Sequence, residues 1–173
     1  GSAFGQAPMD DAHISTRRTV RGAVCLRGRA VPWGYDNRPN AKQHNALWQS
    51  GSDAWAELVD PQSDARAVLD LLQDAPGGPV YVLSATARAD RSIDLSCATA
   101  EASDDGSRVF SRTGKHVAHL DKGESYVGAG IGGDQIVLMS RRDVGSGDEF
   151  HTLTVRMLDG CRPGSSQPMD LQS

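Results

Sequence analysis

The feature that most constrains this chain is a two-residue alternation of apolar side chains, interrupted by turns rich in glycine and aspartate. Residues two apart share one face of a strand, so this alternation predicts strands that bury one face. Turn residues between them predict antiparallel hairpins. The strands predicted in the second half of the chain are Val80–Ser84, Ser92–Ala98, Arg108–Ser111, His116–Leu120, Ser125–Val127, Ile136–Ser140 and Phe150–Leu158.

A further hairpin is expected near the start. Residues 19–26 alternate in the same way, residues 27–29 read Arg-Gly-Arg and predict a turn, and residues 30–33 would return as the partner strand. We find no convincing sequence repeat, although the hairpins between Ser92 and Ser140 have a spacing loosely like that of propeller blades.

One amphipathic helix is predicted over residues 61–75. Asp60 is a good N-cap, and Pro61 suits the first helical position because its missing N–H would be unpaired there anyway. The apolar residues 65, 68, 69 and 72 follow at helical spacing, and Pro-Gly-Gly at 76–78 ends the pattern. The fold class expected is therefore α+β and mostly β, an antiparallel sheet or meander with this helix packed on it.

The chain is long enough for one domain. Its 173 residues divide into an expected flexible arm (1–15), a single globular domain (16–161) and a disordered tail (162–173) that contains Pro163 and Gly164. Gly1 and Ser2 match residues left by cloning. A start at Met9 would favour a cytoplasmic protein, and removal of an export signal would favour a periplasmic or secreted one.

Charge and hydropathy exclude two classes of partner. The 18 basic and 22 acidic residues give a net charge of −4, whereas nucleic-acid backbones are bound by clustered Lys and Arg. No apolar run approaches the ~20 residues needed to cross a bilayer. The expected partner is another protein.

The three cysteines, Cys25, Cys97 and Cys161, lack the close pairing of zinc ligands. We expect one disulfide and one unpaired thiol, which favours export to an oxidising compartment. Sequence does not dictate the pairing; the pair taken forward is Cys97 with Cys161.

A long polar segment over residues 34–52 is the candidate binding surface. Aromatic and arginine side chains dominate interface hot spots, and long loops are often functional. The residues expected to form the surface are Trp33, Tyr35, Asn37, Arg38, His44 and Trp48. The competing interpretation is that Trp33 and Trp48 are core residues that close the end of the sheet.

Residues 128–133, Gly-Ala-Gly-Ile-Gly-Gly, match the spacing of a dinucleotide-binding fingerprint. That motif needs a following helix whose N-terminus receives the pyrophosphate, within a βαβ unit. Residues 134–140 read as well as a strand, so a glycine-rich hairpin connection is the preferred interpretation, and no cofactor is expected.

Metal ligands are not convincing either. His116 and His119 are three residues apart, which places them on opposite faces of a strand. Asp148, Glu149 and His151 would have to converge with them from elsewhere in the chain. Residues 101, 104 and 105 form an acidic cluster that lacks the full ligand ladder of a calcium loop.

A cysteine hydrolase is the alternative function. Cys25 would be the nucleophile, His116 or His119 its base, and Asp121 the orienting group. Against this, Cys25 lies inside an alternating strand, whereas reactive cysteines favour helix N-termini.

The function expected is therefore a non-enzymatic protein-binding module, of the kind found in exported bacterial inhibitors, immunity proteins or accessory subunits. A third possibility uses Trp33 and Trp48 as stacking platforms for a sugar or other small ligand. These hypotheses differ in geometry, because an enzyme needs thiol and imidazole within hydrogen-bond reach.

Overall fold

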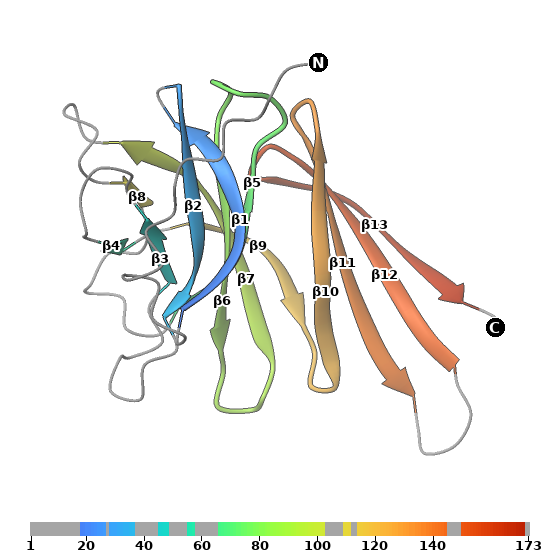
Figure 1. Cartoon of the computed structure of the whole chain (residues 1–173). Coiled ribbons are helices and arrows are strands. Elements are labelled where there is room, and N and C mark those ends of the chain that lie inside the picture. The colour runs from blue at the N-terminus through green and yellow to red at the C-terminus, as the bar shows by residue number, and fades with distance from the viewer. Residues whose placement is uncertain are drawn as a thin grey trace.

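The computed structural model describes residues 18–26, 28–36, 45–48, 55–57, 66–102, 109–111, 114–144 and 150–171. Within these ranges the regular structure consists of strands, and every paired neighbour is antiparallel. The mostly-β, antiparallel fold class is thus confirmed. Figure 1 shows three sheets side by side, blue to teal, green to yellow and orange to red.

The three sheets follow one another along the chain. The first contains β1 (Arg18–Leu26), β2 (Arg29–Asp36), β3 (Asn45–Trp48) and β4 (Trp55–Glu57) in that order. The second contains β5 (Arg66–Leu72), β6 (Tyr81–Ala87) and β7 (Ile93–Ala102), and two short strands, β8 (Val109–Ser111) and β9 (Lys115–Leu120), pair with successive parts of β7. The third contains β10 (Glu124–Gly132), β11 (Gln135–Val144), β12 (Phe150–Asp159) and β13 (Arg162–Leu171).

The second sheet is the middle layer, and both of its faces are buried. Val80 and Val82 pack with the first sheet, whereas the alternating residues Tyr81 and Leu83 pack with the third. All four are at most 8% exposed. A strand covered on both sides needs a continuous apolar run, which is what Val80–Leu83 supplies.

Two cores hold the layers together. The core between the first and second sheets contains Val24, Val31, Trp33, Val68, Leu71, Val80 and Val82. The core between the second and third sheets contains Leu72, Tyr81, Leu83, Leu95, Cys97, Val117, Ala118, Leu120, Ile136, Leu138 and Leu158. Because dispersion and hydrophobic burial scale with area, these two interfaces dominate the stability of the fold.

The helix expected over residues 61–75 is wrong for residues 66–72, which form β5; residues 61–65 lie outside the described residues. β5 belongs to the doubly covered layer, so apolar side chains point to both faces. A bulge at Leu69 also breaks the two-residue period, because Val68 pairs with Ser84 and Asp70 with Leu83. Together these two effects imitate helical spacing.

The disordered tail expected after Cys161 is also wrong for residues 162–171, which form β13 along β12. Prolines at 163 and 168 argued against a strand, but β13 is the last strand of its sheet, and an edge strand tolerates residues without an N–H. Gly164 fits because a Cβ built there would lie 2.7 Å from the Met157 carbonyl oxygen.

A disulfide joins Cys97 of β7 to Cys161 in the β12–β13 turn, with their Cα atoms 5.3 Å apart. It therefore ties the second sheet to the third. This is the pair taken forward from the sequence, and Cys25 is a free thiol.

Gln73 ties the first sheet to the second in a similar way. Its Oε1 accepts a hydrogen bond from the Cys25 amide at 2.6 Å, and its Nε2 donates to the Cys25 carbonyl at 2.7 Å. The same Nε2 donates to the Gly78 carbonyl at 3.0 Å. The side chain thus serves the β1 backbone as a neighbouring strand would.

We predict that Gln73→Glu lowers the free energy of unfolding by about 1–3 kcal/mol, because a carboxylate cannot donate to the two part-buried carbonyls. Urea denaturation measures the change, and Asp74→Asn at the exposed neighbouring position is the control. An unchanged midpoint for Gln73→Glu would show that this amide does not hold the sheets together.

We also predict that the protein, unfolded in urea without reductant, offers one alkylatable thiol per chain, that of Cys25. After reduction, all three cysteines should react. Mass spectrometry of the alkylated chain distinguishes the two states. Three reactive thiols before reduction would contradict the Cys97–Cys161 bond.

Candidate functional site

Trp33 of the expected binding loop lies in the core. It is 4% exposed and packs between the first and second sheets, with its indole over Gly22, where an added Cβ would lie 3.0 Å from Nε1. The core interpretation is therefore correct for Trp33. Tyr35 pairs with Asn45 on the neighbouring strand, and Trp48 pairs with Trp55.

The rest of that prediction is not tested by the structure. Asn37, Arg38 and His44 lie outside the described residues, as do the side chains of Tyr35 and Trp48. The hypothesis that a sugar stacks on Trp33 is not supported, because its indole is buried.

The glycine-rich segment is not a nucleotide-binding loop. β10 runs through Gly132, residues 133 and 134 form a tight turn, and the chain returns as strand β11. The fingerprint needs a helix at this point. Gly133, at φ +60°, supplies the positive dihedral that the turn requires.

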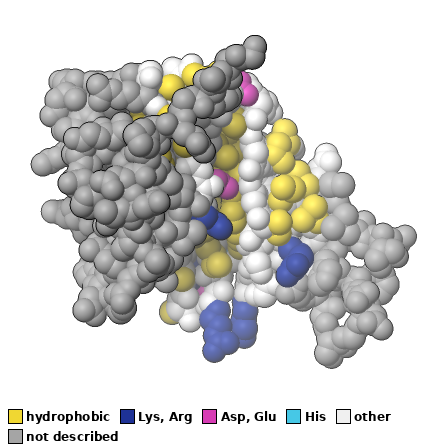
Figure 2. Space-filling model, viewed as in Figure 1, with side chains coloured by type: hydrophobic (Ala, Val, Ile, Leu, Met, Phe, Trp, Pro, Cys, Tyr) yellow, Lys and Arg dark blue, Asp and Glu magenta, His cyan; other side chains and the backbone are white. Residues whose placement is uncertain are grey.

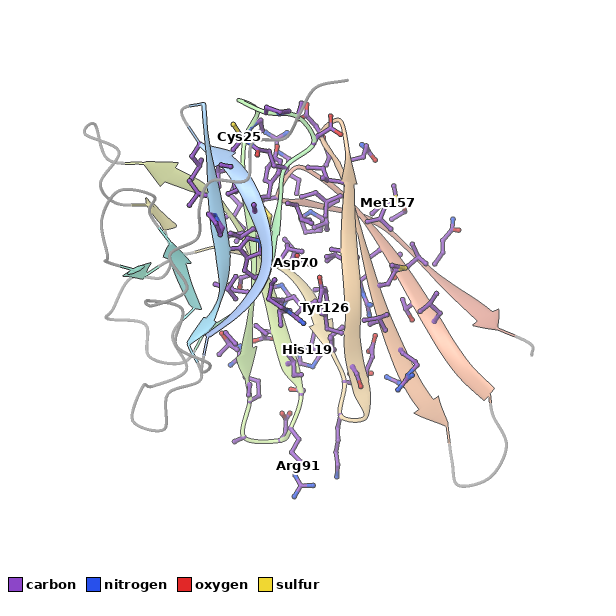
Figure 3. The ribbon with its side chains drawn as sticks, viewed as in Figure 1. Cys25, Asp70, Arg91, His119, Tyr126 and Met157 are labelled. Atoms are coloured by element: carbon purple, nitrogen blue, oxygen red, sulfur yellow. A yellow bond between two sulfur atoms is a disulfide. The ribbon has the colours of Figure 1, made fainter. Side chains whose placement is uncertain are left out.

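Cys25 and His119 lie at opposite ends of the layers (Figure 3). The backbone amide of Cys25 is hydrogen-bonded to Gln73 beside the β5–β6 connection, whereas His119 pairs with Asp94 near the β6–β7 turn. The length of β6 separates these ends, roughly 20 Å at the usual rise per residue. The structure therefore does not assemble the Cys-His pair of the alternative function.

His116 and His119 do share a face, contrary to the expectation for a strand. A bulge at Val117 shifts the pairing, because Leu95 pairs with Ala118 and Ser96 with His116. Both rings consequently turn to Asp94. His119 Nδ1 lies 2.7 Å and His116 Nε2 lies 3.6 Å from its Oδ1.

Asp94 is the centre of a charged cluster at this end of the second sheet. Arg88 bonds its other oxygen, Oδ2, across the β6–β7 hairpin. The turn itself is held by Asp90, which accepts hydrogen bonds from the Ser92 amide and hydroxyl. Arg91 at the tip has φ +71°, an uncommon dihedral for a residue with a side chain.

The cluster continues into the third sheet. His119 Nε2 lies 3.8 Å from Asp121, and Asp121 bonds Arg142 at 2.5 Å. Arg142 is also 3.8 Å from Glu124. The ion pairs thus cross the β9–β10 hairpin, from the edge of one sheet to the first strand of the next.

Glu124 lies inside the third sheet with its side chain 6% exposed. It accepts hydrogen bonds from Arg156 at 2.9 Å and from the Ser140 hydroxyl. Arg156 also donates to Ser140. A buried carboxylate is costly unless paired, and here both its charge and its lone pairs are satisfied.

These contacts shift the protonation of three groups. The hydrogen bonds from His119 and Arg88 hold the pKa of Asp94 below its usual value, and the bond to Asp94 raises the pKa of His119. Burial alone would raise the pKa of Glu124, but the bonds from Ser140 and Arg156 outweigh it and lower that pKa.

In this arrangement His119 is better suited to be a protonated side chain that forms structural ion pairs than to be a catalytic base. Both nitrogens of the His119 ring face carboxylates, Asp94 and Asp121, which favours the doubly protonated imidazolium. A general base needs a free nitrogen lone pair. Among the residues that the structure describes, no group of three or more His, Cys, Asp or Glu side chains is placed to hold a metal ion.

We predict that stability falls as pH rises through the raised pKa of His119. The folded protein holds this proton more tightly than the unfolded chain. The stabilisation is therefore complete below pH 6.5 and is lost as the pH rises from there through the raised pKa of the folded state. His119→Gln should remove this pH dependence, and His116→Gln, farther from Asp94, should retain it. Urea unfolding on both sides of pH 6.5 measures how the free energy of unfolding depends on pH. If this dependence were the same for wild type and His119→Gln, the stabilising role of His119 would be contradicted.

A second polar group lies where the first strands of the sheets meet. Tyr126 of β10 donates to Asp70 of β5 at 3.2 Å (Figure 3). Burial raises the pKa of Asp70, while this hydrogen bond and the charge of Arg21 on β1 lower it in part.

The outer face of the third sheet is a surface feature that the sequence analysis missed. Side chains of β11 alternate, with Ile136 and Leu138 turned into the core and Val137 and Met139 turned away. Figure 2 shows apolar side chains gathered on the third sheet beside β10. The residues of this outer face are Val127, Val137, Met139, Leu153, Val155 and Met157.

The apolar outer face is continuous across three strands. Met139 pairs with Val155, and Val137 pairs with Met157. Val127, at the bulge of β10, is 52% exposed. Gly128 and Gly130 leave open space beside it. The sequence signals for this face are that residues 136–139 of β11 are apolar in both alternating sets and that Leu153, Val155 and Met157 alternate with other residues in β12.

Comparison of the chain with family models, with curated proteins and with solved structures finds no match. No helix in the described part of the chain is long and apolar enough to span a membrane. Function is therefore inferred from the geometry of the chain itself.

Proposed function

We propose that this protein is a non-enzymatic protein-binding module whose binding surface is the apolar outer face of the third sheet. The observation that carries the proposal is the continuous set Val127, Val137, Met139, Val155 and Met157 on the sheet face turned away from the second sheet, with Val127 exposed and the other four half-buried. Contiguous apolar patches on soluble proteins usually mark interaction sites, whereas single exposed side chains do not.

The other packed faces of this chain support the proposal. Valine and leucine side chains on β5 and β6 meet the first sheet, and leucine and isoleucine side chains meet across the second and third sheets. The outer face of the third sheet is likewise aliphatic, with valine, leucine and methionine side chains. When another surface covers such an apolar face, the burial lowers the free energy by about 25 cal/mol per Å² of apolar area.

The ionisable groups also favour binding over catalysis. The separation of Cys25 from His119 removes the assembled nucleophile and base that a cysteine hydrolase requires. The charged cluster around Asp94 consists of mutually neutralising pairs. With a net charge of −4, a protein partner is favoured over nucleic acid.

The compartment forms part of the same proposal. A disulfide between two sheets persists in oxidising surroundings, so Cys97–Cys161 supports a periplasmic or secreted protein. In that setting the module would act as an accessory, inhibitory or immunity factor, with its activity residing in the partner.

We predict that Val127→Asp abolishes capture of a protein partner, because a carboxylate on the covered face would be buried unpaired. Ala89→Asp adds the same charge at an exposed turn of the second sheet and should capture normally. Affinity capture followed by quantitative mass spectrometry compares both with the wild type. Equal recovery of every associated protein by Val127→Asp and wild type would refute this surface.

A further inference from the structure

The first two strands of each sheet share one pairing pattern. In every such pair the first strand contains one extra residue, so that the pairing shifts by one. The extra residues are Arg21 in β1, Leu69 in β5 and Val127 in β10. Bulges are specific, position-dependent features, so three at the same place indicate a structural repeat.

A buried small residue accompanies each bulge. The residue before the bulge pairs with Gly34 on β2, with Ser84 on β6 and with Ser140 on β11. All three of these small residues are buried. The hairpins β1–β2 and β10–β11 match further, since each has five residues between the bulge and a two-residue turn.

The sheets also stack in one manner. β5, the first strand of the middle sheet, contacts the first strands of both neighbours, β1 and β10. At the other edge β4 contacts β8, and β9 contacts β13. Successive antiparallel sheets of four strands, stacked with first strand beside first strand, are the arrangement of propeller blades, and here the middle sheet carries β9 as a fifth strand.

Each of the two outer sheets has one face turned away from the second sheet. At one end of the stack is the apolar outer face of the third sheet. At the other is the outer face of the first sheet, where the described side chains that alternate with the core are small and uncharged, and Arg21 is the exposed residue at the bulge. The small residues are Ala23, Cys25, Ala30 and Pro32, which alternate with the core residues Val24 and Val31.

We propose that a second copy of this chain covers the outer face of the third sheet with the outer face of its own first sheet. β1 of one copy then lies beside β10 of the other, as β1 lies beside β5 and β5 beside β10 within the chain. This inference rests on the proposed binding surface and names its occupant.

A second copy fits for two reasons. It carries a first sheet with the same bulge and order of strands as the sheets that already stack in the chain. It also brings both outer faces, so two reciprocal contacts close the assembly, whereas an unrelated partner would use only one of the two faces. Radial arrays of such sheets usually hold about four to eight, and two copies supply six.

The experiment is analytical ultracentrifugation over a concentration series. Wild type should have twice the 18.4 kDa mass of the chain. Val127→Asp on the third sheet and Ala23→Asp on the first should each be monomeric, with the dissociation constant raised about a hundred-fold or more. Ala89→Asp, on neither face, should remain dimeric, and near-ultraviolet circular dichroism verifies that every variant folds.

Mixing the two monomeric variants gives the decisive result. Their heterodimer has one contact in which both faces are altered and one in which both are intact, so the mixture should recover dimer that neither variant forms alone. A third-sheet face that paired with itself would instead leave Ala23→Asp dimeric, and that result would overturn the inference.

A monomeric wild type would also overturn it. If such a monomer still captured another protein in a Val127-dependent manner, the proposed function would stand with a different occupant. If it captured none, the proposed function would fail as well.

Discussion

Burial of both faces of the second sheet is the constraint on which the rest of the structure depends. Val80 and Val82 need the first sheet to cover them, while Tyr81 and Leu83 need the third. Neither outer sheet alone could remove the middle layer from water, so the three layers are stable only together. Gln73 and the Cys97–Cys161 bond reinforce the two interfaces separately, one by hydrogen bonds to a strand backbone and the other by a covalent link.

Polar groups occupy the places where this stack ends or where its strands converge. Asp94, His119 and Asp121 link the second sheet to the third through alternating charges, and Glu124 continues the series into the interior. Since each charge has an opposite neighbour, the cluster tolerates partial burial and raises the pKa of its histidine. The cost of ordering these side chains is offset by the register that they impose on the β9–β10 hairpin.

The outer face of the third sheet follows from the same plan of construction. In such a repeat each sheet buries one face on the preceding sheet and presents its other surface to the next layer. Val127 and Met157 lie on that surface here, as Tyr81 and Leu83 lie on the corresponding face of the middle sheet. The proposed binding of a further layer would use a surface that the fold itself generates.

The sequence by itself located β1, β2 and β6 to β12 and their alternation, because side-chain period is a local property of the backbone; it did not locate β3, β4, β5 or β13. It also suggested the Cys97–Cys161 pair without requiring it. Only the tertiary structure decided that residues 66–72 form a strand, that Trp33 is buried, and that a bulge turns His116 and His119 to one face. The helix signal around β5 failed because apolar residues on two covered faces, shifted by a bulge, mimic a period of 3.6. Which faces are covered depends on contacts between residues distant in the chain, and no local pattern specifies those contacts.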